Sequence, residues 1–150
     1  MVVRRATSED WRELRALRLR ALADSPDAFL ATFGEAQARS DDEWQDWGSS
    51  GVVFVDDAFD GMAGGFVTDE GDVMLWGMWV APDRRGSGLA EALARAVIDW
   101  ARGERVLRVV LWVVIGNAPA ERFYARLGFA PTGVTARLRN GIDRQLALPL

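Results

Sequence analysis

The 150-residue chain contains no cysteine, no histidine and no lysine. Without cysteine it can form no disulfide and no thiolate metal site, and it has no cysteine nucleophile. Without histidine it lacks the commonest general base and metal ligand. Without lysine it can form neither a Schiff base nor the lysine contact of a phosphate-binding P-loop. We therefore expect no metal site and no covalent cysteine or lysine intermediate.

Long apolar runs and a surplus of basic residues are also missing. No stretch approaches the ~20 apolar residues that span a bilayer, and Met1 is followed by Val2-Val3-Arg4-Arg5 instead of an apolar signal segment. We expect a cytoplasmic protein with no membrane partner. The net charge of −4 argues against nucleic acid as a partner and is compatible with a cationic or neutral partner such as an amine.

The hydrophobic patterning predicts one mixed α/β domain over residues 1–150. Capping signals at Thr7 and Ser40 open helices that run to about residues 22 and 47, and further helices are expected at 88–102 and 118–127. Asp60-Gly61 and Asn140-Gly141 are hairpin turn signals. Strands are expected at 2–5, 52–55, 66–68, 73–80, 106–115, 134–139 and 142–148.

The first helix has an apolar face that includes Leu14 and Leu17. Arg12, Arg15 and Arg18 lie off that face at helical spacing. We therefore expect these three arginines to form a solvated surface.

A glycine-rich loop, Arg84-Arg85-Gly86-Ser87-Gly88-Leu89-Ala90, joins the expected strand 73–80 to the helix 88–102. Glycine lets backbone approach a ligand closely, and the free N–H groups and dipole of a helix N-terminus bind phosphate. Arg84 and Arg85 add positive charge where a phosphate would lie. The alternative is a turn without a ligand, since short glycine motifs produce many false positives. The loop also lacks the full glycine fingerprint of a dinucleotide fold.

The segment 117–129 carries a second set of candidates. Asn117 stands where a helix N-cap is wanted, and capping alone would explain it. Tyr124 shares a helix face with Ala120 and Leu127, and it is the only tyrosine beside seven tryptophans and seven phenylalanines. One interpretation is a ring packed in the core whose hydroxyl has a hydrogen-bond partner. The other is a phenol whose proton is used in catalysis.

Together these segments resemble the GNAT superfamily of N-acetyltransferases. Arg85, Gly88 and Ala90 fill the three fixed places of its acetyl-CoA signature, [QR]-x-x-G-x-[GA]. The run from Asn117 through Phe123-Tyr124 to Gly128-Phe129 matches its second segment, and 17–29 resembles the N-terminal part of many members. The similarity covers essentially the whole chain.

The resemblance implies a central mixed sheet of about seven strands flanked by about four helices. Two central strands, 73–80 and 106–115, would splay apart into a cleft. That cleft would receive the pantetheine arm and the acetyl group of acetyl-CoA. A homodimer is an expectation at the level of the family only.

The resemblance also implies roles for individual residues. Backbone groups of Met78 and Val80 would pair with the pantetheine amides like an added strand, and an N–H near Met78 or Trp79 would polarise the acetyl carbonyl. Asn117 would contact the cofactor arm, and Tyr124 would protonate the departing thiolate. The backbone N–H groups that would hold the pyrophosphate follow the signature residue Arg85 and are those of Gly86, Ser87, Gly88, Leu89, Ala90 and Glu91.

The sequence departs from the family at the positions where many members carry a general base for the amine proton. Many members carry a glutamate on the first splayed strand or near the end of the second, and the aligned residues here are Met74 and Ile115. Neither can accept a proton. The acidic turn Asp69-Glu70-Gly71-Asp72 is the nearest alternative by sequence, although charged turns are usually just solvated. We therefore expect turnover to follow the ionisation of the acceptor amine itself.

Aromatic residues would line the acceptor side, with Phe29, Phe33 and Trp76 as candidates and core packing as the alternative for each. The expected activity is transfer of an acetyl group from acetyl-CoA to a small-molecule or peptide primary amine, by direct attack in a ternary complex. Two other hypotheses stay open. One is a catalytically silent module that senses acyl-CoA, which the missing base favours. The other is a nucleotide-binding domain, which the incomplete glycine motif disfavours.

Overall fold

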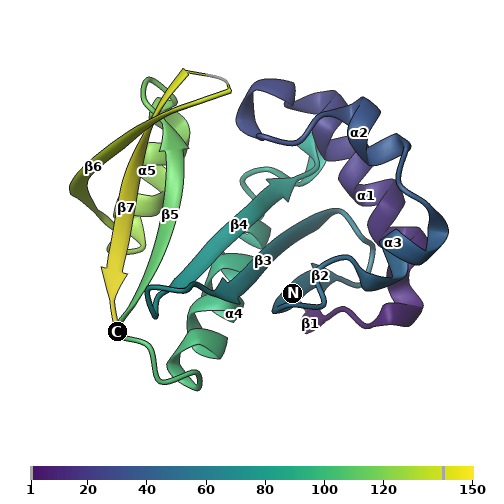
Figure 1. Cartoon of the computed structure of the whole chain (residues 1–150), viewed down its shortest axis with the longest axis horizontal. Coiled ribbons are helices and arrows are strands. Elements are labelled where there is room, and N and C mark those ends of the chain that lie inside the picture. Colours follow the sequence, from purple (N-terminus) through teal and green to yellow (C-terminus); the bar gives the residue numbers. More distant parts are fainter. Residues whose placement is uncertain (1, 140) are drawn as a thin grey trace.

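The computed structural model describes residues 2–139 and 141–150 and contains a mixed seven-stranded sheet in the order β1-β2-β3-β4-β5-β7-β6 (Figure 1). The strands are β1 (Val3–Arg5), β2 (Val52–Asp56), β3 (Gly61–Val67), β4 (Val73–Val80), β5 (Arg108–Val114), β6 (Ala130–Leu138) and β7 (Gly141–Pro149). The α-helices of the described residues are α1 (Trp11–Asp24), α2 (Phe33–Gln37), α3 (Asp41–Asp46), α4 (Leu89–Arg102) and α5 (Ala118–Arg126).

Each face of the sheet has its own apolar core. Helices α4 and α5 cover one face, and α1 to α3 gather over the other (Figure 1). Helix α4 presents Leu89, Leu93 and Val97 at helical spacing and buries all three side chains completely. On the opposite face, Leu17 of α1 and Trp44 of α3 pack in the second core. The sheet therefore separates the helices that follow β4 from those that precede β2.

Strands β4 and β5 are parallel neighbours only at their beginnings. The pairs are Val73 with Val109 and Met74 with Val110. Beyond these two pairs, no residue of β4 pairs with a residue of β5 in the described structure. Strand β4 stays paired with β3, and β5 with β7, over almost their full lengths. The two halves of the sheet therefore diverge toward the C-terminal ends of β4 and β5 (Figure 1).

These features confirm the predicted mixed α/β fold, its seven strands and its splayed central pair. The sequence analysis missed α2, because five residues are too few to show a helical period. Strand β6 begins four residues before its predicted start, in a stretch that Pro131 and Gly133 interrupt, and proline is tolerated there because β6 is an edge strand. The hairpin of β6 and β7 is confirmed, although Asn140 lies outside the described residues. No described helix is long and apolar enough to cross a membrane.

The prediction that Arg18 is solvated is wrong. Its side chain retains only 7% exposure and lies in the core under α1. The rings of Phe29, Trp47 and Trp76 surround its guanidinium, with centroids 4.7, 5.6 and 5.9 Å away. The spacing of apolar residues identified one buried side of α1. The segments after α1 and α3, which carry Phe29 and Trp47, bury a second side that includes Arg18.

Candidate active site

A cavity of about 420 Å³, here called the cleft, lies where β4 and β5 separate. Its walls come from β4, from the segment after α1, and from the first turns and inner faces of α4 and α5. It brings together eight predicted site residues, namely Phe29, Met78, Trp79, Val80, Arg85, Ala90, Asn117 and Tyr124. Ser25, Ala28, Pro119, Ala120 and Phe123 complete the lining.

A β-bulge in β4 shapes one wall of the cleft. Between Trp76 and Trp79 the register with β3 shifts, so that Gly77 and Met78 together oppose the single residue Ala63. Gly77 takes a positive φ of 67°, a conformation that favours glycine. The extra residue reverses the alternation of side chains, so Met78 packs toward α4 and Trp79 lies in the core under α1. Because β4 has already left β5 here, the backbone on this edge has no strand partner.

The glycine loop forms a second cavity of about 240 Å³ that shares Val80, Arg85, Ala90 and Phe123 with the cleft. Gly86 and Gly88 have positive φ angles of 78° and 92°. A Cβ built on either glycine would meet no atom within 4 Å. Both therefore face open space, as expected for a loop that a ligand approaches closely.

Free backbone donors point out of the start of α4. Gly88 is its N-cap, and the N–H groups of Ala90 and Glu91 find no acceptor in the part of the chain that the structure describes. The N–H of Leu89 reaches Ser87 Oγ at 3.4 Å, while the Leu89 side chain is fully buried. Free N–H groups and the dipole of a 14-residue helix make an anion-binding arrangement.

Tyr124 lines the cleft with a ring that is 8% exposed. The rings of Phe123 and Phe129 hold it edge-on, with centroids 5.1 and 5.7 Å away. Its hydroxyl makes no hydrogen bond to any described residue. Burial raises the pKa of Tyr124, so the phenol keeps its proton at neutral pH.

A sequence profile of the acetyltransferase (GNAT) family matches residues 11–129. The chain belongs to the GNAT family.

Relatives of this GNAT chain include mycothiol acetyltransferases. That of Clavibacter michiganensis is 31% identical over 136 residues, which cover 89% of this chain and 44% of that protein. That of Salinispora tropica is 34% identical over 125 residues, which cover 77% of this chain and 39% of that protein. The chain thus spans less than half the length of these relatives. The structure of yncA from Salmonella typhimurium, solved with acetyl-CoA, has the same fold with a TM-score of 0.79 at 21% identity, covering 100% of this chain and 94% of that one.

The two arginines of the glycine loop are held by carboxylates. Arg84 Nη1 lies 3.0 Å from Asp60 Oδ2 and 3.4 Å from Asp56 Oδ2, so its charge is largely used within the fold. Arg85 donates from Nη2 to Asp24 Oδ2 at 2.7 Å and from Nε to the Val80 carbonyl at 3.1 Å. Arg85 thereby ties the end of α1 to the end of β4 and remains half-exposed at the cleft.

The sequence analysis missed Arg126, which lines the glycine-loop cavity. No described acidic group pairs with it, and its guanidinium lies 6.0 Å from the ring centroid of Phe123. Arg126 follows Phe123 by three residues in α5, so the two share a helix face. The sequence offered a signal for Arg126, because it lies three residues after Phe123, which directly precedes the predicted site residue Tyr124.

Asn117 is the N-cap of α5, and its Oδ1 accepts a hydrogen bond from the Ala120 N–H at 3.4 Å. The cap uses the amide oxygen and leaves the amide nitrogen without a described partner. Since Asn117 also lines the cleft, capping and ligand contact are compatible.

The other predicted aromatic residues do not line the cleft with Phe29. Phe33 is 40% exposed on α2. Trp76 packs against the core under α1, where its ring meets that of Trp47 edge-on at 5.2 Å. Trp76 therefore lies behind the cleft wall, one residue before the bulge.

The acidic turn before β4 lies at the closed end of the splayed pair. Asp72 forms a two-pronged ion pair with Arg108, with distances of 3.0 and 3.1 Å. The next residue, Val73, is still paired with Val109 of β5. Asp69 and Glu70 are exposed. None of the three carboxylates lines the cleft.

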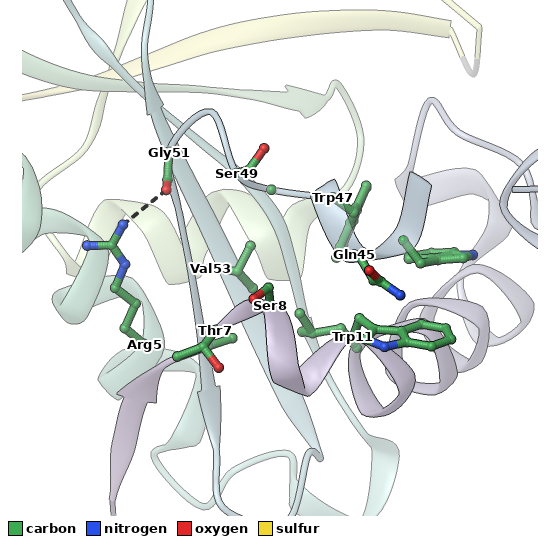
Figure 2. Close-up of a pocket in the computed structure, with 13 residues that line it drawn as sticks. Arg5, Thr7, Ser8, Trp11, Gln45, Trp47, Ser49, Gly51 and Val53 are labelled. Carbon is green, nitrogen blue, oxygen red and sulfur yellow. Dashed lines mark hydrogen bonds between the residues drawn. The ribbon is translucent and has the colours of Figure 1, made fainter. Parts of the chain in front are cut away.

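A further cavity of about 320 Å³ lies among the start of α1, α3 and the start of β2 (Figure 2). Trp11, Gln45 and Trp47 border it, and Arg5 closes one side with a hydrogen bond from Nη2 to the Gly51 carbonyl at 3.4 Å. It contains none of the predicted site residues and shares no lining residue with the cleft. The cleft is therefore the stronger candidate for the active site.

Proposed function

We propose that the chain is an acetyl-CoA-dependent N-acetyltransferase that acts on a primary amine of a small molecule or peptide. One observation carries the proposal. The cleft combines an unpaired strand edge, a free phenol on Tyr124 and an adjoining anion-binding loop. Membership of the GNAT family and the acetyltransferase activity of its relatives, the mycothiol acetyltransferases, support it.

The residues present fit acetyl-CoA. The open space over Gly86 and Gly88 and the free N–H groups at the start of α4 suit the pyrophosphate. Arg126 adds an uncommitted positive charge to the same cavity. The free edge of β4 would pair with the pantetheine amides as an added strand, and Asn117 would contact the arm through its amide nitrogen. Bound acetyl-CoA supplies a thioester, whose carbonyl carbon a neutral amine can attack.

The residues of the cleft would act on that reaction through position and proton transfer. A backbone N–H of the bulge at Met78 or Trp79 would polarise the carbonyl oxygen. The amine nitrogen bonds to the carbonyl carbon while the carbon–sulfur bond breaks, and Tyr124 gives its proton to the departing sulfur. The tyrosinate then recovers a proton from the nitrogen through water. The products are an amide and a free thiol, and no protein nucleophile is consumed.

The test is thiol release during incubation with acetyl-CoA and a panel of primary amines. Release that depends on an amine, with the acetylated amine found by mass spectrometry, is the expected result. Tight binding of acetyl-CoA without release under any amine would favour the silent sensor. Failure to bind acetyl-CoA at all would remove both hypotheses.

A further inference from the structure

Asp24 is the last residue of α1, a position that does not suit its charge. The C-terminal end of a helix carries a partial negative charge, so a carboxylate there is unfavourable for the helix itself. Asp24 does not line the cleft, although Ser25, the next residue along the chain, does. The reason for an aspartate at this position therefore has to come from its contacts outside the helix.

One carboxylate oxygen of Asp24 accepts three hydrogen bonds. Its Oδ2 receives the Ser25 hydroxyl at 2.7 Å, the Trp79 indole N–H at 3.0 Å and an N–H of Arg85 Nη2 at 2.7 Å. All three donors line the cleft, and they come from the segment after α1, from β4 and from the glycine loop. These bonds lower the pKa of Asp24 to about 2, so the carboxylate is charged at neutral pH. Asp24 therefore joins three separate parts of the cleft lining.

Arg85 connects Asp24 to the free edge of β4. Its Nε and Nη2 share one edge of the planar guanidinium, and Nε donates to the Val80 carbonyl at 3.1 Å while Nη2 donates to Asp24. Val80 opposes Gly61 of β3, but the Gly61 N–H donates to Asp56 Oδ1 instead of to Val80. The Val80 carbonyl therefore points away from β3, toward the edge that β4 leaves unpaired. A rigid fork thus fixes the orientation of a carbonyl on the free edge.

We propose that Asp24 is a positioning residue for acetyl-CoA, which holds Arg85 against the Val80 carbonyl and so fixes the free edge of β4 and the start of the glycine loop before the cofactor binds. The proposal rests on the proposed function and concerns the same cleft. A carbonyl oxygen accepts two hydrogen bonds, so Val80 keeps one lone pair for a pantetheine amide. Groups that are already in place bind a ligand more tightly, because less conformational freedom is lost on binding.

The experiment is a double-mutant cycle of Asp24→Asn and Arg85→Met, with acetyl-CoA binding measured by calorimetry at a temperature where thermal denaturation shows every variant folded. Asp24→Asn keeps the size of the side chain and removes the charge that holds Arg85, so Kd should rise about fivefold or more. In the Arg85→Met background the same change should alter Kd less than about twofold, because Asp24 acts through Arg85. The matched control is Asp99→Asn, which breaks an ion pair with Arg102 of the same 2.7 Å length at the far end of α4 and should leave Kd unchanged.

Arg85→Lys distinguishes the bridge from the charge alone. Lysine keeps a positive charge beside the glycine loop, but it cannot present two parallel N–H groups on one rigid plane. Kd for acetyl-CoA should therefore rise at least as much as in Asp24→Asn. In thiol release, KM for acetyl-CoA should rise in both variants while kcat changes less, because Tyr124 is untouched.

Acetyl-CoA binding that Asp24→Asn leaves unchanged or tightens would overturn the proposal and leave the acetyltransferase intact. Equal losses from Asp24→Asn in the presence and absence of Arg85 would overturn it as well, since Asp24 would then act without Arg85. Wild-type affinity in Arg85→Lys would show that charge alone matters and would refute the bridge. Should Asp24→Asn not fold, the comparison of Arg85→Lys with the wild type decides the question. A wild type that binds no acetyl-CoA would remove the proposed function and this proposal together.

Discussion

Replacing Tyr124 with phenylalanine distinguishes a catalytic role of the hydroxyl from a packing role of the ring. Both edge-on contacts, at 5.1 and 5.7 Å, involve the ring alone and survive the change. The hydroxyl has no hydrogen-bond partner among the described residues, so its removal breaks no bond. Because the ring contacts survive and no described bond is lost, the variant should be about as stable as the wild type. We therefore expect Tyr124→Phe to leave Tm nearly unchanged.

Activity, by contrast, should fall. A general acid contributes about 10²–10⁴-fold, and kcat measured by thiol release should fall by an amount in that range. The dissociation constant for acetyl-CoA, measured by calorimetry, should barely change, because the hydroxyl acts on the sulfur only as the thiolate departs. A kcat equal to that of the wild type would refute the acid role. A clear drop in Tm would show instead that the hydroxyl makes a bond that holds the fold.

Three further predictions address the surroundings of the cleft. Gly88→Glu places bulk and negative charge where the loop now faces open space, so calorimetry should show at least tenfold weaker acetyl-CoA binding, which is ~1.4 kcal/mol. Asp72→Asn breaks the pair with Arg108 at the closed end of the splayed strands, and kcat should change less than the ~10²-fold of a general base. Hydrogen bonds from Ser25, Trp79 and Arg85 lower the pKa of Asp24 to about 2, so its stabilisation is present above the unfolded pKa and is lost as pH falls through 2. Asp24→Asn should therefore flatten the fall in Tm between about pH 4 and pH 2, measured by thermal denaturation.

Local sequence signals predicted the parts of the site that are local in structure. Strand β4 has the same bounds as the predicted strand 73–80. A continuous apolar run indicated it, because a strand that is covered on both faces does not alternate apolar and polar residues. Asn117 caps α5 where its signal placed it, and α4 begins one residue after its predicted start, with Gly88 as its N-cap. The glycine loop and Tyr124 therefore follow from neighbours along the chain.

Interactions between distant segments could not be predicted in the same way. The burial of Arg18 depends on Trp47 and Trp76, which lie about thirty and sixty positions away along the chain. The face of Asp143 depends on its pairing with Val114 in β5, and a shift of one residue would turn it toward α5. The bulge at Gly77 was equally hidden, because a glycine inside a strand pattern is compatible with regular pairing as well.

Three arrangements that cost the fold free energy lie at or beside the cleft. The edge of β4 is unpaired, Gly77 holds a positive φ, and the Tyr124 hydroxyl has no described hydrogen-bond partner. Other buried atoms without a described partner belong to residues that do not line the cleft, namely Arg18, Arg39, Trp44 and Asp143. By contrast, Arg84 and Arg108 are each paired with a carboxylate. An unpaired strand edge beside a strained glycine and a free phenol is typical of a site where a ligand supplies the missing partners. Because the unpaired groups at the cleft are a strand edge and a proton donor, the ligand they fit is an extended amide chain that ends in a group able to take a proton.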